Sequence, residues 1–275
     1  MRAKGALLCA AVLLGGCTID RGGEVPATTT VVAEESPTSE PSSAPALPEL
    51  FVAGGEFGAV LYDGSQSHTF GTLVSDVSWS TIKVPIALAA AAQGTADPGL
   101  VAAALQHSDN AAALSLWQSL GSDVQAAGVV QQHIAGLAPA PVVNSVPSRP
   151  GFSVFGQTTW PLASQAEYGY WLGCDPNAAI VTDNMGLVTP EQRDGLGQIP
   201  GMRFKGGWGP DPSGGYLVRQ FGFVETPAGR FGVAIAARPT DGSYMSAQMM
   251  LDEVASQLQQ RMVAGGALNC AELPR

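Results

Sequence analysis

The sequence predicts an α+β fold, in which both ends of one domain contribute strands to a five-stranded antiparallel sheet. Three observations predict it: two β-prone segments come early, a long helical region follows, and three more strand segments precede a final helix. We therefore expect helices to flank the sheet, with an all-helical subdomain inserted between its two halves.

The early strands are separated by a turn. The segment GAVLYD, residues 58–63, is apolar and β-prone, and its last residue begins an Asp-Gly turn pair. SHTFGTLV, residues 67–74, returns as the second strand. A helix is expected from Ser80, because the apolar run that follows ends in alanines and is typical of a buried helix.

A mostly helical region follows, from about residue 99 to residue 191. Its clearest candidate helices span residues 109–120, 122–134, 162–172 and 177–185. Strand patterns return in GMRFKGG, YLVRQFGFVE and RFGVAIAARP, which the turn segments PDPSGG and TPAG separate. The last helix is predicted over residues 246–263, where apolar residues recur at helical spacing.

The first residues form a secretion signal. Arg2 and Lys4 precede the apolar run ALLCAAVLLGG, which is too short to span a bilayer as a mature helix. The run ends at LGGC, which resembles a bacterial lipobox. The resemblance implies cleavage before Cys17 and a lipid on its sulfur, which would anchor the protein to the extracytoplasmic face of the cell membrane. The alternative is an ordinary secretion signal with an incidental cysteine.

The chain is thus expected to divide into four segments. Residues 1–16 are the lipoprotein signal peptide, and residues 17–50 are a disordered tether rich in Pro, Ser, Thr and Glu. Residues 51–265 are the folded domain, with 51–95 and 200–265 as its α/β part and 96–199 as its helical part. Residues 266–275 form a C-terminal tail.

Composition and cysteine usage bound the function. Hydrophobic residues make up 45% of the chain, so a large core is feasible, and the formal net charge of -10 argues against nucleic acid or an anionic membrane as an electrostatic partner. We expect a monomer. Cys174 and Cys270 remain after the signal and the lipidated cysteine, and an oxidising compartment favours a disulfide between them. The alternative is two buried free thiols.

Only two lysines follow the signal peptide, and each lies in a short motif. In the first motif, Ser80-Thr81-Ile82-Lys83, positions i and i+3 share a helix face, so the hydroxyl of Ser80 and the amine of Lys83 can meet. A serine needs a base to become a nucleophile, and burial lowers the pKa of a lysine toward that role. Alone, this motif is weak, because such spacings also arise by chance.

Two further motifs follow. Ser108-Asp109-Asn110 opens the helix NAAALSLWQSL, and its alternative reading is a plain N-terminal cap. Lys205-Gly206-Gly207 ends a strand pattern, and its alternative reading is a glycine turn. The three histidines show no spacing typical of a metal site, and the sequence has no P-loop, GxGxxG or CxxC pattern. We therefore expect no metal and no cofactor.

The order S-x-x-K, S-D-N, K-x-G resembles that of the class A serine β-lactamases and the penicillin-binding DD-peptidases, over about residues 57–263. TTWP, residues 158–161, also resembles the start of the helix after the Ω loop in class A enzymes. The resemblance implies the β-lactamase/DD-peptidase fold. It also implies that a β-lactam or a D-alanyl peptide acylates Ser80 and that Lys83 is its base.

The same resemblance implies roles for the other motif residues. Ser108 would relay a proton to the leaving nitrogen, Asn110 would position the substrate near Lys83, and Lys205 would supply positive charge for Ser108 and for a substrate carboxylate. The backbone N–H groups of Ser80 and Trp208 would form the oxyanion hole.

Three departures from the family pattern modify this expectation. Gly206 stands where the family usually has a hydroxyl residue, so Gly206, Gly207 and a compensating Arg219 are the expected substrate-binding residues. No Asp or Glu lies between Asp123 and Glu167, where class A enzymes carry the glutamate that activates water. The interval from Ser80 to Ser108 is also short, which predicts a pared-down helical subdomain and a more open cleft.

The sequence therefore predicts a cell-envelope lipoprotein that is a serine hydrolase, with a β-lactam, a peptidoglycan-type peptide or a related amide or ester as substrate. The missing acid predicts slow deacylation of the acyl-enzyme. The alternative is a non-catalytic binding lipoprotein that retains the fold.

Overall fold

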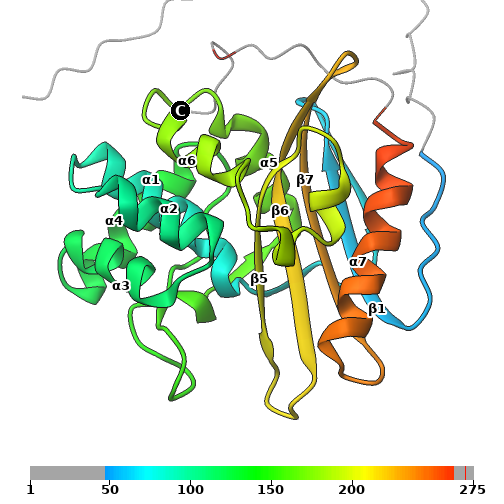
Figure 1. The fold of residues 1–275 in the computed structure, drawn as a ribbon, viewed down its shortest axis with the longest axis horizontal. Helices are drawn as coiled ribbons and strands as arrows, with labels where there is room; N and C mark the ends of the chain where they lie inside the picture. Colours follow the sequence, from blue (N-terminus) through cyan, green and yellow to red (C-terminus); the bar gives the residue numbers. More distant parts are fainter. Residues whose placement is uncertain (1–46, 263–269, 271–275) are drawn as a thin grey trace, which may run out of the picture. The chain divides into compact units, whose positions relative to one another are not determined.

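The computed structural model describes residues 47–262 and Cys270 (Figure 1). Its main sheet has five antiparallel strands in the order β2-β1-β7-β6-β5. Early strands β1 (Gly55–Tyr62) and β2 (Ser67–Gly71) pair beside late strands β5 (Arg203–Pro210), β6 (Tyr216–Thr226) and β7 (Gly229–Pro239). The two ends of the domain meet where β1 pairs with β7, in a register that sets Ala59 opposite Ile235. This confirms the predicted sheet.

The central strands are buried on both faces because their side chains alternate between two cores. Val233 and Ile235 of β7 pack in the core beside α7 (Tyr244–Gln259), whereas Ala234 and Ala236 face the other core. Helix α5 (Leu162–Leu172) packs against β7, β1 and β6 in that second core. Figure 1 shows α7 on one side of the sheet and the remaining α-helices on the other.

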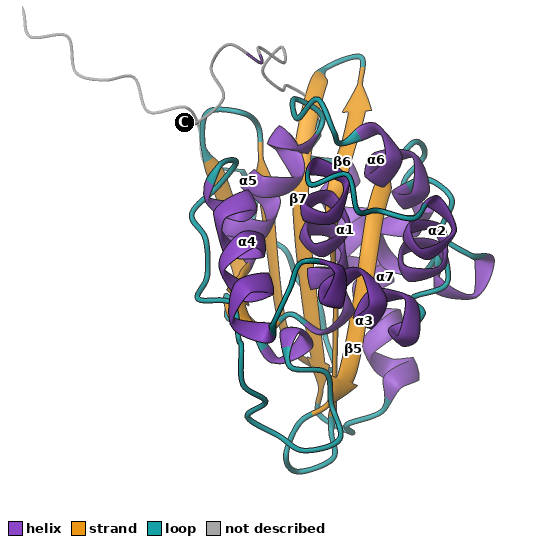
Figure 2. Cartoon of the chain, turned by 90° about the vertical axis from the view of Figure 1, so that its left-hand side faces the viewer, coloured by secondary structure: helices purple, strands orange, loops and turns teal. Residues whose placement is uncertain are grey.

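The helices on the second side surround α1 (Lys83–Ala92), which packs against α2 (Pro98–Gln106), α3 (Asn110–Ser119), α4 (Asp123–Ala135) and α6 (Ala179–Met185). Figure 2 looks onto these helices, with the sheet behind them. Eight of the ten residues of α1 are buried. The helix of alanines and aliphatic residues therefore forms the centre of the helical region and fixes what lies at its N-terminus.

Several details differ from the sequence prediction. The chain at Ser80 begins as a 3-10 turn, η1 (Trp79–Ile82), and becomes α-helical only at Lys83. Helix α2 lies within the region predicted to be mostly helical, although it was not among the clearest candidate helices. The small sheet of β3 (Ser75–Val77) with β4 (Thr159–Pro161) was not predicted. Strands of three residues carry too little periodicity to be recognised, and their pairing joins segments far apart in sequence. Helix α5 packs on the sheet, although the sequence places it within the helical part.

Parts of the expected organisation lie outside the described residues. These are the signal peptide, Cys17, most of the tether and, except for Cys270, the C-terminal tail. Within the described part of the chain, no helix is long and apolar enough to cross a membrane.

The described residues confirm the expected disulfide. Cys174, just after α5, is bonded to Cys270, with 5.3 Å between the two Cα atoms and a sequence separation of 96 residues. The bridge therefore ties the C-terminal end of the chain to the helical side of the domain.

Replacing both cysteines by alanine should lower the free energy of unfolding by about 4 kcal/mol, because the bridge closes a long loop in the unfolded chain. Urea unfolding of the oxidised wild type and the double variant measures the difference. Reduced wild type is the matched control and should behave like the variant. Equal stability of oxidised wild type and variant would contradict the expected contribution.

Candidate active site

Ser80 lies on the 3-10 turn η1, which neighbouring segments hold in place. The Ser78 N–H donates to the Thr158 carbonyl at 2.7 Å, and the Thr81 hydroxyl donates to the Ser78 carbonyl at 2.6 Å. Trp79, directly before Ser80, has φ 48°, in the left-handed region that a bulky residue rarely adopts. Such a conformation persists only where the surroundings enforce it, and it is typical of functional sites.

Edge strand β5 runs directly against this turn. A Cβ atom on Gly207 would lie 2.7 Å from the Ser80 nitrogen and 2.9 Å from the Ser78 carbonyl oxygen. Only glycine permits this approach of two backbones. At Gly206 the nearest atom to such a Cβ would be 3.8 Å away, so that position has room for a side chain. The structure thus places the backbone of Gly207 against the 3-10 turn that carries Ser80, whereas a Cβ at position 206 would be directed away from that turn.

The amine of Lys83 is 1% exposed and is surrounded by oxygen atoms of the S-D-N motif. Nζ donates to the Ser108 carbonyl at 2.5 Å, to Asn110 Oδ1 at 2.7 Å and to the Asp109 carbonyl at 3.2 Å, and it lies 3.4 Å from Ser108 Oγ. Asp109 also caps α3, because its carboxylate accepts from the Ala112 N–H at 2.7 Å. The capping role and the motif role therefore coexist.

Lys205 completes the cluster from β5. Its amine is fully buried and donates to Ser108 Oγ at 2.9 Å and to the Gly206 carbonyl at 2.8 Å. Burial, together with the nearby charge of Lys83, holds the pKa of Lys205 well below its usual range. Ser108 has φ 59°. Among the described residues, Ser108 and Trp79 are the two non-glycine residues with positive φ. Both lie at this site.

The protonation state of Lys83 follows from its partners. Burial lowers the pKa of Lys83 to about 8, and the Asp109 carboxylate partly opposes that shift. Three of its oxygen partners can only accept hydrogen bonds, and only an ammonium has three protons to donate. The observed arrangement thus fits the charged form, and about a tenth of the amine is neutral at pH 7.

The expected contact between Ser80 and Lys83 is not formed. Among the described residues, no hydrogen bond joins Ser80 Oγ to Lys83 Nζ, because the amine points to the S-D-N segment. Both residues nevertheless line one cleft of about 490 Å³. Five aromatic residues also line it: Trp79, Phe152, Phe155, Trp208 and Tyr216. The other lining residues are Asn110, Leu114, Gly151, Ser153, Gly209 and Pro210.

No carboxylate lines this cleft. The loop of residues 139–158 contributes Phe152, Ser153 and Phe155, and it is held by Gln157, whose amide bonds to five groups of the same loop. Glu167 lies within α5, where burial raises its pKa, and its carboxylate contributes to the raised pKa of Tyr62. Neither segment offers an acid beside Ser80.

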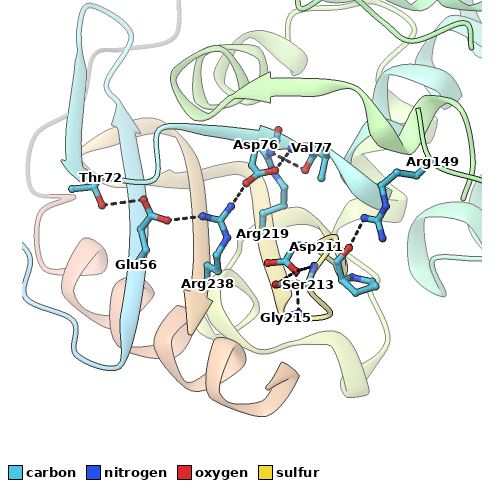
Figure 3. Close-up of polar contacts among 11 residues, drawn as sticks. Glu56, Thr72, Asp76, Val77, Arg149, Asp211, Ser213, Gly215, Arg219 and Arg238 are labelled. Atoms are coloured by element: carbon cyan, nitrogen blue, oxygen red, sulfur yellow. Dashed lines mark hydrogen bonds and ion pairs between the residues drawn. The ribbon is translucent and has the colours of Figure 1, made fainter. Parts of the chain in front are cut away.

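Arg219 corrects one sequence prediction. Its side chain is fully buried and donates to the backbone carbonyls of Asp76, Val77 and Trp160 and to Gln165 Oε1. Burial lowers its pKa to about 10, so it stays charged at neutral pH. Figure 3 shows the Arg219 side chain directed toward Asp76 and Val77. Arg219 therefore braces β6 against β3 and cannot reach a ligand in the cleft.

The polar contacts of Arg219 continue on one side to the 3-10 turn that carries Ser80 and on the other side to Arg238. Gln165, which accepts from Arg219, donates through Nε2 to Thr81 Oγ1 at 2.9 Å. On the other side, Arg238 pairs with Asp76 and with Glu56, as Figure 3 shows. A polar chain thus links the sheet to the residue next to Ser80.

Solved structures resemble the fold of this chain. A β-lactamase from Burkholderia vietnamiensis is 19% identical over 78% of this chain and 93% of its own, with a TM-score of 0.60. A class A β-lactamase from Bacteroides cellulosilyticus is 12% identical, with coverage of 75% and 93% and a TM-score of 0.59. The TLA-3 extended-spectrum β-lactamase is 11% identical, with coverage of 76% and 94% and a TM-score of 0.61. The chain has the class A β-lactamase fold. No protein-family model and no curated protein matches its sequence.

Within this β-lactamase fold, the three motifs converge as their order predicts. Ser80, Lys83, Ser108, Asn110 and Lys205 gather around one cluster, and Trp208 lies beside Ser80 on the cleft wall. The aromatic residues of the cleft and the left-handed conformation of Trp79 were not predicted from the sequence. Trp79 adjoins the first motif, so its position offered a signal, whereas Phe152, Phe155 and Tyr216 carried none. In the described part of the chain, no group of three acidic, histidine or cysteine residues is arranged to hold a metal.

The reaction of Ser80 with a fluorophosphonate should accelerate about tenfold per pH unit below pH 8 and level off above it. A lysine can accept a proton only in its neutral form, and burial lowers the pKa of Lys83 to about 8, so the predicted role of Lys83 as the base sets this profile. Labelling rates from pH 6 to pH 10 measure the profile.

An Asn110→Leu variant separates Lys83 from Lys205 in this profile. It removes an oxygen that stabilises the ammonium of Lys83, so the inflection should move to lower pH. Lys83→Met should remove the inflection. A wild-type inflection near the ordinary lysine pKa would contradict the role of burial.

Proposed function

We propose that this protein is a serine hydrolase that is acylated at Ser80 by a β-lactam, a D-alanyl peptide or a related amide or ester. The observation that carries the proposal is the buried amine of Lys83, held by Ser108, Asp109 and Asn110 in the wall of a cleft that also contains Ser80. A buried amine with a pKa of about 8 suits proton transfer at neutral pH.

In the proposed reaction, neutral Lys83 takes the Ser80 proton as Oγ bonds to the carbonyl carbon. The N–H groups of Ser80 and Trp208 stabilise the oxyanion that forms. Ser108 then gives its proton to the leaving nitrogen as the C–N bond breaks, and it regains a proton from Lys83. The contacts of Ser108 Oγ with Lys205 Nζ at 2.9 Å and Lys83 Nζ at 3.4 Å support this relay.

Release of the acyl group is proposed to be slow. Hydrolysis of an ester on Ser80 needs a base to activate water, and the cleft lining holds phenyl rings and Ser153 where the loop approaches Ser80. Hydrolysis of the acyl-enzyme would then be the rate-limiting step, and the acyl-enzyme would accumulate.

A non-catalytic binding lipoprotein is the second candidate. The missing hydroxyl at Gly206 and the absence of a hydrogen bond between Ser80 and Lys83 favour it. It gives no reason for a buried lysine cluster beside a serine, which costs folding free energy. We therefore prefer the hydrolase.

We also propose that a lipid on Cys17 anchors the protein to the extracytoplasmic face of the cell membrane. The lipobox-like LGGC sequence and the polar segment after it support this proposal, as does the disulfide, which forms in oxidising compartments.

Exposure to a fluorescent penicillin or a fluorophosphonate should add one probe mass to Ser80, and the adduct should persist because no acid assists its hydrolysis. Intact-mass spectrometry over time measures both formation and loss. Ser80→Ala should remain unmodified, and Ser153→Ala is the matched control in the same cleft. Failure of both probes to label the wild type would reject the hydrolase and favour the binding protein.

Replacing Cys17 by serine should move the protein from the membrane fraction to the soluble fraction, because the lipid attaches to the thiol. Fractionation of cells that secrete each form measures this shift. Cys9→Ser, within the apolar run, serves as the control and should stay membrane-bound. Membrane retention of the Cys17→Ser protein would reject the anchor.

A further inference from the structure

The cleft extends from Lys83 and Asn110, past Ser80, to the end of β5. Ser80 lies against Gly207 of β5, and the Ser108–Lys205 cluster lies toward the start of that strand. The part of the cleft toward the other end of the strand, which we call the open half, is lined by Gly209, Pro210 and Tyr216 together with Gly151 and Phe152. If Ser108 protonates the leaving group, the leaving group lies on the Lys205 side. The open half then receives the acyl portion, which stays on Ser80.

Arg149, on the loop of residues 139–158, is not itself one of the lining residues, but it contacts two of them at the end of this open half. Its Nη1 donates to the Pro210 carbonyl at 2.7 Å, and its guanidinium lies 4.6 Å from the centre of the Phe152 ring. Pro210 and Phe152 both line the cleft. Figure 3 shows the Arg149 side chain extending toward the turn after β5. The half-buried cation therefore bridges the two walls at one end of the cleft.

Arg149 has no carboxylate partner within the described part of the chain. Asp211 is next to Pro210, but its carboxylate accepts from Ser213 N at 2.7 Å, Ser213 Oγ at 2.6 Å and Gly215 N at 3.1 Å. The other described arginines contact groups outside the cleft lining: Arg193, Arg203, Arg219, Arg230, Arg238 and Arg261. Among the described arginines, Arg149 is thus the one whose contacts lie at the cleft lining.

We propose that Arg149 binds a carboxylate on the acyl portion of the substrate, which makes acyl donors with an acidic acyl half the preferred class. The inference rests on the proposed acylation of Ser80. A guanidinium that makes one hydrogen bond retains donors for a carboxylate, and it recognises that group with charge-assisted hydrogen bonds. The stacked Phe152 ring holds the guanidinium plane in place for this contact.

The distance along β5 sets the length of the acyl group. Pro210 is three residues beyond Gly207, which is about 10 Å of extended strand. One glycine followed by a five-carbon chain spans roughly 9 Å. An N-glutaryl-glycyl donor therefore places its terminal carboxylate near Arg149, and an N-valeryl-glycyl donor places a methyl group there.

Glutaryl-glycyl and valeryl-glycyl thioesters form the matched substrate pair for the test. Wild type should acylate about tenfold faster with the glutaryl donor, the effect of one charge-assisted hydrogen bond. Arg149→Gln should bring the ratio of the two rates close to one, and Arg149→Lys should keep part of the preference. Arg261→Gln removes the same charge just after α7 and should retain the wild-type ratio.

The outcomes separate this proposal from a structural role. If Arg149→Gln slows both donors equally, the guanidinium only ties the loop to Pro210, and the proposal is overturned. The proposal is likewise overturned if Arg261→Gln lowers the ratio as much, since a general field effect then explains the preference.

A binding measurement tests Arg149 independently of the chemistry. Amide analogues of the two donors, titrated calorimetrically into Ser80→Ala, should differ about tenfold in Kd, and Arg149→Gln in that background should abolish the difference. If wild type reacts with neither donor but the binding difference is present, acylation fails and the Arg149 site stands. Equal Kd values, or no binding of either amide, overturn the Arg149 proposal.

Discussion

The charge on Lys83 is the constraint on which the rest of the site depends. Lys83 is 1% exposed, so its ammonium group loses its hydration shell when the chain folds. Three oxygen atoms of residues 108–110 replace the lost hydrogen bonds to water. To supply them, the chain must hold the start of α3 against α1 and keep Ser108 in a left-handed conformation. Lys205 then bonds to Ser108 from β5. Segments that are distant in sequence are therefore positioned around one amine.

Local patterns in the sequence were enough to predict most elements of the fold. Helix α5 has the predicted bounds, and the strands of both chain ends form the predicted sheet, because each carries several residues with a clear period. The site motifs were also recognisable, since each is short and contiguous. Their convergence followed from the order of the motifs and from the scarcity of lysine.

Interactions between distant segments could not be predicted in the same way. Arg219 lies on the predicted strand, yet its direction depends on carbonyl groups of β3 and β4 and on Gln165. Those partners come from segments that sequence patterns do not pair. The orientation of Lys83 is another example: helical spacing allows a contact with Ser80, but the competing oxygens of the S-D-N segment take the amine. Burial and competition among partners decide both cases.

The two glycines after Lys205 differ in what the backbone demands of them. A side chain at position 207 would collide with the turn that carries Ser80, so a substitution there would force β5 to move away from that turn. Position 206 has no such neighbour, and a Cβ atom fits there in the same backbone. The backbone therefore restricts the last position of the motif to glycine but leaves its middle position free of that restriction. A methyl group added at 206 would leave the close approach of β5 to the turn at Ser80 unchanged.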